Sequence, residues 1–374
     1  MSAAAAVADA DETADVDTAA IARGIEKLLT PNLPGVTSVH VDHVKRVFGG
    51  NARTAWACEG RWRDSSGVEQ REDLILLTRI EGSQVQTDPE WEFGVLSALT
   101  GQHVRAPRAW AHDTDGTVFG TASVLLERVS GSADAVAFLK NSNTEEGREL
   151  TLDLARATAE LHSAQWRTGG LGPLLGAVHS AEVARSPRAQ VEHWHGQFES
   201  SRLEPHPVLT YLFGWLTENL PDPVELTIVH GDLRPGNFLY EGASVVALLD
   251  WEMAHIGDPV EDIAWAYRAL WSPERFVSAE DFVAEYERAG GPEISRRSLL
   301  YYRVFSEVKF ATISLQAARA FIDGSSTSVR LLDRARTVIP ALQRSLGWVR
   351  ELSAGDSSES DPAASAHDER IPQC

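Results

Sequence analysis

The chain has 374 residues, of which 43% are hydrophobic and 24% charged, and its formal net charge is −20. This length predicts two domains or one bilobal unit, and the acidic balance argues against a nucleic-acid partner, which requires a basic surface. Its two cysteines, Cys58 and Cys374, cannot build a disulfide framework or a zinc site. Because neither a signal peptide nor an apolar run of membrane-spanning length is visible, we expect a cytoplasmic protein without a membrane partner.

Residues 1–18 and 353–374 have the composition of disordered tails. The first segment is rich in Ala and acidic residues, and the second is rich in Ser, Ala and Asp. Such segments bury too little apolar surface to offset the entropy that ordering costs. For residues 1–18 a frayed helix is the alternative, since alanine favours helices.

Residues 19–130 are expected to form a small β-rich lobe that contains one helix. The segments 54–62, 73–80 and 121–129 are short and alternate in polarity, which is typical of antiparallel strands. A helix is predicted between them, with Asp88 as its N-cap, Pro89 at its first position and Gly101 just past its end.

Residues 131–352 are expected to form a larger, mostly helical lobe. The segment 145–165 places its apolar residues on one helical face, and segments 207–220 and 296–321 show similar spacing. In the first of these segments the face consists of Leu150, Leu154, Ala157 and Leu161. The chain is therefore predicted to be an α+β protein with two lobes.

The stretch IVHGDLRPGNFLY, residues 228–240, places polar residues between two apolar runs inside the helical lobe. A Pro-Gly pair within it allows the chain to reverse, and a second apolar run at 244–249 completes a hairpin. This hairpin is predicted to return Asp250 close to Asn237 and Asp232. Two carboxylates and an amide would then meet at one end of the hairpin.

That set of side chains suits the transfer of a phosphoryl group from a magnesium nucleotide. Mg²⁺ prefers oxygen ligands, which Asn237 and Asp250 can supply. Asp232 could accept the proton of an attacking hydroxyl, and Arg234 could neutralise charge on the moving phosphoryl group. His230 completes the catalytic candidates, as a residue that shapes the loop through hydrogen bonds to the backbone.

The motifs HGDLRPGN and LLDWE resemble those of the aminoglycoside phosphotransferase and choline kinase superfamily, which has a bilobal protein-kinase-like fold. Within this superfamily, the overall residue pattern most resembles the kinase-like domain at the N-terminus of some long acyl-CoA dehydrogenases. The resemblance extends over residues 36–345. It implies an ATP-dependent, Mg²⁺-dependent kinase acting on a small-molecule hydroxyl, with Asp232 as the base and with Asn237 and Asp250 as metal ligands.

Two further segments resemble the family's phosphate-binding parts. FGGNARTAW, residues 48–56, resembles the glycine-bearing turn that covers the phosphates, whose tip is matched by Gly49, Gly50 and Asn51. LILLTRIEG, residues 74–82, resembles the strand that carries a phosphate-binding cation. That role falls to Arg79, because the preceding position, which is often basic in the subgroup, is Thr78.

WEFGVLSAL, residues 91–99, resembles the helix whose glutamate pairs with this cation, which indicates Glu92 rather than Glu90. LLERVSG, residues 125–131, resembles the linker in which the backbone of residues from Glu127 to Val129 would meet the adenine.

HIGDPVEDIAW, residues 255–265, resembles the segment after the metal-binding aspartate. Asp258 and Asp262 would brace the loop or cap a helix that begins near Val260. Three histidines at positions 193, 195 and 206 lack companions at metal-ligand spacing, so we interpret them as surface or pocket residues.

The identity of the phosphate acceptor is left open between an aminoglycoside and a hydroxyacyl-CoA. The resemblance to the subgroup slightly favours a hydroxyacyl-CoA. A CoA ester requires a basic patch near the site, whereas an aminoglycoside requires acidic residues. Choline would need an aromatic and acidic cage.

Two other classes are weighed against a small-molecule kinase. One is a nucleotide-binding pseudokinase or scaffold, although the set of Asp232, Asn237 and Asp250 is intact. The other is a protein kinase, although the expected activation loop with an Ala-Pro-Glu motif is missing. The oligomeric state and the choice between ATP and GTP are left open.

Overall fold

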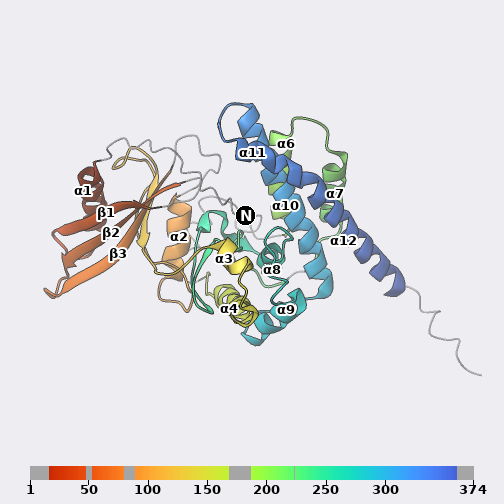
Figure 1. Ribbon diagram of the computed structural model, residues 1–374, viewed down its shortest axis with the longest axis horizontal. Helices are drawn as coiled ribbons and strands as arrows, with labels where there is room; N and C mark the ends of the chain where they lie inside the picture. The colour runs from red at the N-terminus through yellow and green to blue at the C-terminus, as the bar shows by residue number, and fades with distance from the viewer. Residues whose placement is uncertain (1–16, 48–52, 80–88, 168–186, 223, 360–374) are drawn as a thin grey trace, which may run out of the picture. The chain divides into compact units, whose positions relative to one another are not determined.

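The computed structural model describes residues 17–47, 53–79, 89–167, 187–222 and 224–359 (Figure 1). The chain divides into two compact units, the first made of residues 1–80 and 110–128 and the second of residues 81–109 and 129–374. Within the described ranges, no helix is both long and apolar enough to cross a membrane.

The first unit is built on a five-stranded sheet with the order β1-β2-β3-β5-β4. The strand pairs β1–β2, β2–β3 and β3–β5 are antiparallel, which confirms the antiparallel strands expected within the segments 54–62, 73–80 and 121–129, of which residue 80 lies outside the described residues. The elements of this unit are α1 (Thr18–Leu29), η1 (Thr30–Asn32), β1 (Val39–Val47), β2 (Arg53–Arg63), β3 (Glu69–Arg79), β4 (Ala109–Asp113) and β5 (Ser123–Glu127).

Helix α1 covers one face of this sheet. Asp17 caps the helix by accepting the backbone N–H groups of Ala19 and Ala20 at 3.0 and 3.1 Å. Its buried face consists of Ile25, Leu28 and Leu29, which join one apolar core with alternate residues of β1, β2 and β3. The strand alternation seen in the sequence thus follows from a sheet that packs its core on the α1 side.

The second unit is mainly helical and carries two small two-stranded sheets, β6 with β9 and β7 with β8. Its first elements are α2 (Pro89–Leu99), α3 (Ala135–Leu139), α4 (Thr144–His162), α6 (Pro187–Ser201), α7 (Pro207–Glu218), β6 (Thr227–Val229), β7 (Phe238–Glu241) and β8 (Ser244–Leu248). They are followed by η2 (Trp251–Met253), β9 (His255–Gly257), α8 (Val260–Ala266), α9 (Ala279–Arg288), α10 (Arg296–Ile322), α11 (Val329–Asp333), η3 (Arg334–Thr337) and α12 (Val338–Glu359).

Helix α10 is the central element of the second unit. It packs against α6, α7, α8, α11 and α12, and Figure 1 shows α12 running beside it. Because it is covered on many sides, most of its residues are buried, including the charged Glu307 and Lys309. The predicted apolar face of α4 is also confirmed, since Leu150, Leu154, Ala157 and Leu161 are all buried.

The unit boundaries differ from the expected lobes in two places. Residues 81–109, which include α2, group with the second unit, because the indole of Trp91 donates a 2.7 Å hydrogen bond to the carbonyl of Ala254. Helix α12 continues to Glu359, so residues 353–359 of the expected tail are helical. The predicted N-cap of α2, Asp88, lies outside the described residues.

Candidate active site

The loop of residues 230–237 joins the two small sheets of the second unit. It leaves β6, which pairs with β9 so that Val229 lies opposite His255, and it enters β7, which pairs with β8. These short strands end at the loop because the sequence changes there from apolar residues to the HGDLRPGN run. The predicted strand–loop–hairpin order is confirmed.

A buried aspartate braces the start of this loop. The carboxylate of Asp262 accepts the backbone N–H of His230 at 2.7 Å and that of Gly231 at 2.8 Å. It also accepts a hydrogen bond from His162 at 3.1 Å. Burial raises the pKa of the Asp262 carboxyl, but these hydrogen bonds and His162 outweigh burial, so its pKa lies below the usual range. Asp262 therefore braces the loop, as expected.

The companion residue Asp258 caps a helix. Its Oδ1 accepts the backbone N–H of Val260 at 2.9 Å, at the first residue of α8. Burial raises the pKa of the Asp258 carboxyl to about 6. Both roles that the sequence allowed for this pair of aspartates, bracing and capping, are thus confirmed.

His230 holds the loop to the hairpin. Its Nε2 donates to the carbonyl of Leu249 at 2.9 Å, and its Nδ1 accepts the backbone N–H of Asp232 at 3.3 Å. The imidazole ring lies 4.9 Å from the ring of Trp251. These contacts agree with the loop-shaping interpretation of His230.

Gly231 is required by a close approach of two backbone segments. Its φ is +80°, and a Cβ atom at this position would lie 2.3 Å from the carbonyl oxygen of Met253. Any side chain would therefore push the loop away from η2. The carbonyl of Gly231 in turn accepts a 2.7 Å hydrogen bond from Nζ of Lys309.

Lys309 belongs to a buried charged network under the loop. Its Nζ lies 2.9 Å from Glu261 Oε1, and both side chains are 1% exposed. Burial raises the pKa of the Glu261 carboxyl, but Lys309 and His255 outweigh it and lower that pKa to about 2. Burial lowers the pKa of His255, yet Glu261 outweighs burial and the net pKa is raised. Charge pairing thus favours the charged forms of Glu261 and His255 against the effect of burial.

Three side chains fix the carboxylate of Asp232. Trp265 donates its indole N–H to Oδ1 at 2.7 Å, and Asn237 donates Nδ2 to Oδ2 at 2.6 Å. Arg234 shares its Nε between the two oxygens at 3.1 and 3.2 Å. Asp232, Arg234 and Asn237 are thus brought together as predicted, although their chemical roles stay predictions.

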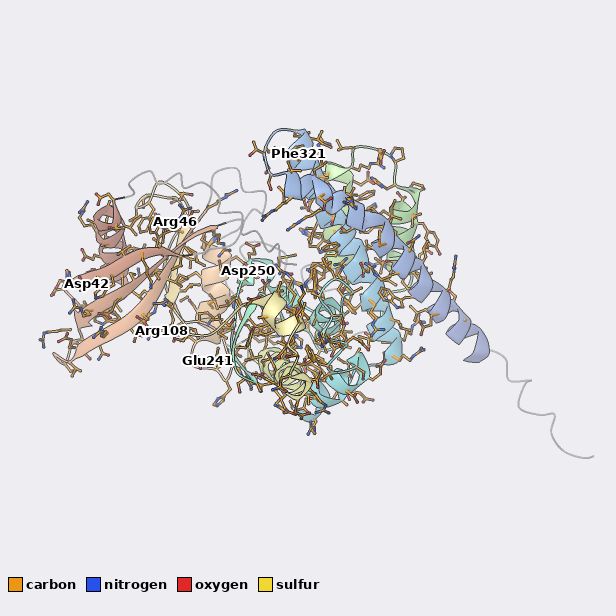
Figure 2. The ribbon with its side chains drawn as sticks, in the orientation of Figure 1. Asp42, Arg46, Arg108, Glu241, Asp250 and Phe321 are labelled. Atoms are coloured by element: carbon orange, nitrogen blue, oxygen red, sulfur yellow. The ribbon has the colours of Figure 1, made fainter. Side chains whose placement is uncertain are left out.

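Asn237 and Asp250 meet through the β7–β8 hairpin. The backbone N–H of Leu249 donates to the carbonyl of Asn237 at 2.8 Å, which brings the next residue, Asp250, beside the end of the loop. Figure 2 shows Glu241 at the turn of this hairpin and Asp250 at the opposite end. Asp250 has φ +67°, a left-handed conformation that is uncommon outside glycine and often found at functional sites.

The donor set at this end of the hairpin fits a magnesium ion. The amide of Asn237 directs Nδ2 at Asp232, which leaves its Oδ1 for another partner, and Asp250 adds a carboxylate. Such a pair is typical of Mg²⁺ sites that are completed by phosphate oxygens and water. In the described part of the chain, no group of three or more His, Cys, Asp or Glu residues has the arrangement of a metal site.

The predicted nucleotide-binding residues are divided between the units. Arg79 ends β3 in the first unit, whereas Glu92 is 2% exposed in the first turn of α2 in the second. Their ion pair, and the contacts of Glu127 and Val129 with adenine, stay predictions. Gly49, Gly50 and Asn51 lie outside the described residues.

The strand register adds a cation that the sequence analysis did not consider. Arg53, at the start of β2, lies directly opposite Arg79 of β3. Residues that oppose each other in an antiparallel pair project on the same face of the sheet. The guanidinium group of Arg53 is therefore on the same face of the sheet as that of Arg79, the residue predicted to bind phosphate.

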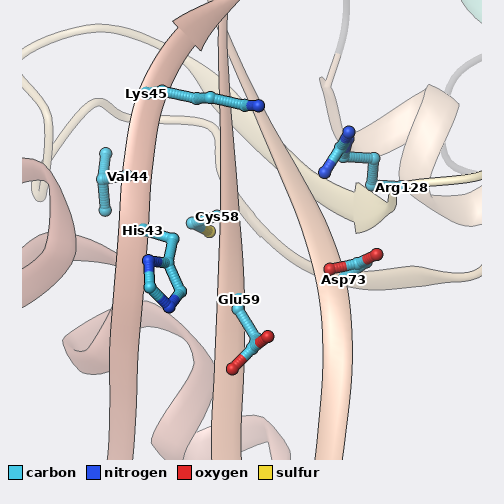
Figure 3. A pocket seen from close by; sticks show the side chains of 7 residues that line it. All are labelled: His43, Val44, Lys45, Cys58, Glu59, Asp73 and Arg128. Atoms are coloured by element: carbon cyan, nitrogen blue, oxygen red, sulfur yellow. The ribbon is translucent and has the colours of Figure 1, made fainter.

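A hollow of about 450 Å³ opens on the sheet of the first unit. Figure 3 shows its lining by charged side chains of both signs from β1, β2 and β3, together with Arg128. Burial raises the pKa of the Cys58 thiol to about 12, so this cysteine is not a reactive thiolate. None of the predicted site residues lines this hollow, and we assign it no chemical role.

An aromatic group surrounds the Trp265 indole next to Asp232. The ring of Trp271 lies 5.3 Å from that of Trp265, and Phe310 of α10 lies 6.4 and 5.7 Å from the two indoles. The guanidinium of Arg268 stacks 3.3 Å from the Phe310 ring and 4.9 Å from the Trp271 ring. The cation and the rings thus form one packed group beside Asp232.

The residues around the loop that sequence reasoning missed are Glu261, Trp265 and Lys309. One signal was present, because Glu307 and Lys309 interrupt the apolar pattern of the segment 296–321 at positions that a buried helix would cover. Charged residues in such positions require partners. The sequence does not reveal which partners they have.

The comparisons with known proteins agree with this geometry. Residues 67–300 match the family described as the phosphotransferase enzyme family. Acyl-CoA dehydrogenase family member 11 of Gallus gallus is 26% identical over 285 residues, which is 70% of this chain and 35% of that protein. The chain thus spans about a third of the length of this relative.

Solved structures with the same fold include a proposed aminoglycoside phosphotransferase from Ralstonia eutropha JMP134, at a TM-score of 0.68 and 21% identity. That match covers 90% of this chain and 98% of the other. The GDP and kanamycin complex of APH(2")-IIia matches at a TM-score of 0.56 and 14% identity, covering 86% and 97%. The fold is therefore the kinase-like fold of these proteins, and the chain belongs to the phosphotransferase enzyme family.

Proposed function

We propose that this protein transfers the γ-phosphoryl group of Mg-ATP to a hydroxyl group of a small molecule. The observation that carries this proposal is the placement of Asp232, whose carboxylate is oriented by Trp265, Asn237 and Arg234 within 3.2 Å. A carboxylate held in one orientation, beside an amide and a second carboxylate, is what phosphoryl transfer to an alcohol requires.

In the proposed reaction Asp232 accepts the proton of the acceptor hydroxyl. The freed oxygen forms a bond to the γ-phosphorus, and the bond from that phosphorus to the β,γ-bridging oxygen breaks to release ADP. The contact of Arg234 with Asp232 is the longest of the three, and its side chain is 35% exposed. Arg234 can therefore turn towards a phosphoryl oxygen and stabilise its charge.

Asn237 and Asp250 hold the metal in this proposal. Mg²⁺ bound there would neutralise phosphate oxygens and orient them. The hairpin contributes rigidity, since the Leu249–Asn237 backbone hydrogen bond fixes the two ligands relative to each other. Arg79, with Arg53 opposite it, and the segments at 49–51 and 127–129 are the proposed contacts of the nucleotide.

Two classes of small molecule are proposed as the acceptor of the phosphoryl group. Similarity to part of the acyl-CoA dehydrogenase family members supports a hydroxyacyl-CoA. The kanamycin named in the complex of APH(2")-IIia supports an aminoglycoside, although that likeness concerns the fold alone. The first class is favoured, because that similarity is seen in the sequence itself.

A screen of ATP consumption tests the proposal. The panel contains aminoglycosides, macrolides, hydroxyacyl-CoAs and amino alcohols, and a thermal-shift assay with and without Mg²⁺ measures nucleotide binding separately. We expect Mg²⁺-dependent stabilisation by ATP and phosphorylation of at least one acceptor class. The proposal is wrong if the protein binds no nucleotide under conditions in which it is folded.

A further inference from the structure

An arginine of the C-terminal helices reaches the surroundings of Asp232. Arg334 is the first residue of η3, which lies between α11 and α12 and packs against α10. It is distant in sequence from the 230–237 loop, and no motif indicated it.

Helix α10 contacts both η3 and the aromatic group of Trp265, Trp271 and Phe310. Ser314 of α10 is hydrogen-bonded to Thr337 of η3 at 3.2 Å between their hydroxyl oxygens. Phe310, one helical turn before Ser314 and therefore on the same face of α10, contacts Trp265 and Trp271. The same face of α10 thus carries the aromatic group beside Asp232 and the anchor of η3.

The charges of this region interact with one another. Arg334 is exposed as a residue, and the pKa of its guanidinium is lowered by partial desolvation first, then by repulsion from Arg234, while attraction to Asp232 acts in the opposite direction. Arg234 lies on the Trp271 ring, with its Cζ 5.7 Å from the ring centroid. Arg334, Arg234 and Asp232 therefore lie within reach of one another's electrostatic fields.

Arg334 adds an arginine to this region, although the chain as a whole is strongly acidic. Among the described residues, Arg334 has neither a side-chain hydrogen bond nor an ion pair, whereas its neighbour Arg336 pairs with Asp333 at 3.2 Å. The carboxylate of Glu307 on α10 is shared by Arg268 and Arg344, both at 2.9 Å or less.

We propose, on the basis of the function proposed above, that Arg334 determines acceptor specificity by binding an anionic group of the acceptor, a carboxylate or a phosphate. The acceptor hydroxyl then faces Asp232 while the anionic end lies at η3. An anion between two guanidinium groups relieves their repulsion and accepts charge-assisted hydrogen bonds. A polycationic acceptor is disfavoured by the same charges, which act as a repulsive element.

Matched acceptors of opposite charge test this assignment. The probes are 6-hydroxyhexanoate, 6-amino-1-hexanol and the CoA thioester of 6-hydroxyhexanoate, whose negative charge resides on phosphates alone. They are compared in wild type, Arg334→Gln, Arg334→Lys and Arg336→Gln. The last variant makes the same charge change in the same short helix, at an arginine that is exposed like Arg334 but is paired with Asp333.

We expect wild type to prefer an anionic probe and Arg334→Gln to raise the KM for that probe roughly tenfold or more. The kcat and the KM for ATP should stay near wild type, Arg334→Lys should recover part of the loss, and Arg336→Gln should have little effect. A preference of the free carboxylate over the thioester identifies a carboxylate site, and the reverse identifies a phosphate site.

Three results would overturn the inference and leave the kinase proposal intact. They are a preference for the amino alcohol, equal acceptor KM values in Arg334→Gln and Arg336→Gln, or a rise in the KM for ATP instead of the acceptor. If no probe is phosphorylated, titration calorimetry measures the binding of the same probes to wild type and to Arg334→Gln and decides whether Arg334 binds the anionic group. Tighter binding of an anionic probe to wild type than to Arg334→Gln supports the assignment, and equal or absent binding contradicts it.

Discussion

The indole N–H of Trp265 donates a 2.7 Å hydrogen bond to Oδ1 of Asp232. Trp265 belongs to the short helix α8, which also contributes Asp262 to the start of the loop and Glu261 to Lys309. One helix of seven residues thus orients the proposed base, holds its loop and pairs with the buried lysine beneath it. The position of the Asp232 carboxylate is therefore set by contacts from α8 as well as by its own loop.

Replacing Trp265 with Phe should slow turnover without weakening nucleotide binding. The substitution keeps an aromatic ring but removes the donor that orients Asp232, and a small misplacement of a base costs roughly 10- to 100-fold in kcat. Steady-state kinetics and the nucleotide Kd measure the two effects. Trp215→Phe, in α7, is the matched control and should leave kcat unchanged; an equal kcat in both variants contradicts the orienting role.

Replacing Asp250 with Asn should increase the Mg²⁺ concentration that nucleotide binding requires. Asn tolerates the left-handed backbone at this position, with φ +67°, so the change removes charge while the hairpin is retained. We expect a loss of roughly tenfold or more in apparent Mg²⁺ affinity, measured by nucleotide binding across a Mg²⁺ titration. The exposed Asp222→Asn serves as control, and an unchanged Mg²⁺ dependence in Asp250→Asn would exclude it as a ligand.

Replacing Lys309 with Met should destabilise the protein strongly. The change leaves Glu261 buried without its lysine, which costs about 3–5 kcal/mol in the free energy of unfolding. The double variant with Glu261→Gln should recover part of that loss, because the buried unpaired charge is then removed. Chemical denaturation measures Lys309→Met, Glu261→Gln and the double variant, and the exposed Lys140→Met should stay within about 0.5 kcal/mol of wild type. Strictly additive losses would show that the two side chains do not interact.

Asp258 should make stability depend on pH in a defined direction. Burial raises its pKa from the usual 3.8 of an aspartate to about 6 in the folded protein, so the folded state binds the proton more tightly than the unfolded state. The tighter proton binding by Asp258 stabilises the folded state by its full amount below about pH 4. This stabilisation is lost as the pH rises through about 6.

The variant Asp258→Asn isolates that contribution. Relative to wild type, its free energy of unfolding should increase by up to about 3 kcal/mol between roughly pH 4 and pH 7. Denaturation of both proteins across this range measures the difference. A difference that is constant with pH would show that Asp258 titrates normally in the folded state.

Sequence reasoning was most successful where short-range periodicity decides structure. The spacing of Leu150, Leu154 and Leu161 predicted a buried helical face, and the alternation in residues 73–80 predicted a strand. The sequence also predicted that a hairpin returns Asp250 towards Asn237, and the pairing of β7 with β8 and the Leu249–Asn237 backbone hydrogen bond agree with that.

Contacts between residues far apart in the chain were not predictable in this way. Trp265 is 33 positions from Asp232, and Lys309 is 48 positions from Glu261. Periodicity shows that α10 is buried but not which loop its lysine supports. The excess of acidic residues likewise gave no indication that Arg334 lies near Arg234 and Asp232, since net charge says nothing about where individual charges lie.

The chain's end shows a further limit of composition. Residues 353–359 are rich in small and acidic residues, yet they continue α12 to Glu359. A helix that is already nucleated by packing adds residues at little cost, so a disorder-like composition does not stop it at once. The composition of a segment therefore needs to be judged together with the element that precedes it.

The most direct test of the central claim is single-turnover kinetics of Asp232→Asn with Mg-ATP and an acceptor identified by the screen. We expect phosphoryl transfer to fall by roughly 100-fold or more while the Kd for Mg-ATP changes little, because Asp232 meets the acceptor hydroxyl and not the nucleotide. Asp222→Asn should behave as wild type. A transfer rate close to that of wild type in Asp232→Asn would contradict the assignment of Asp232 as the base.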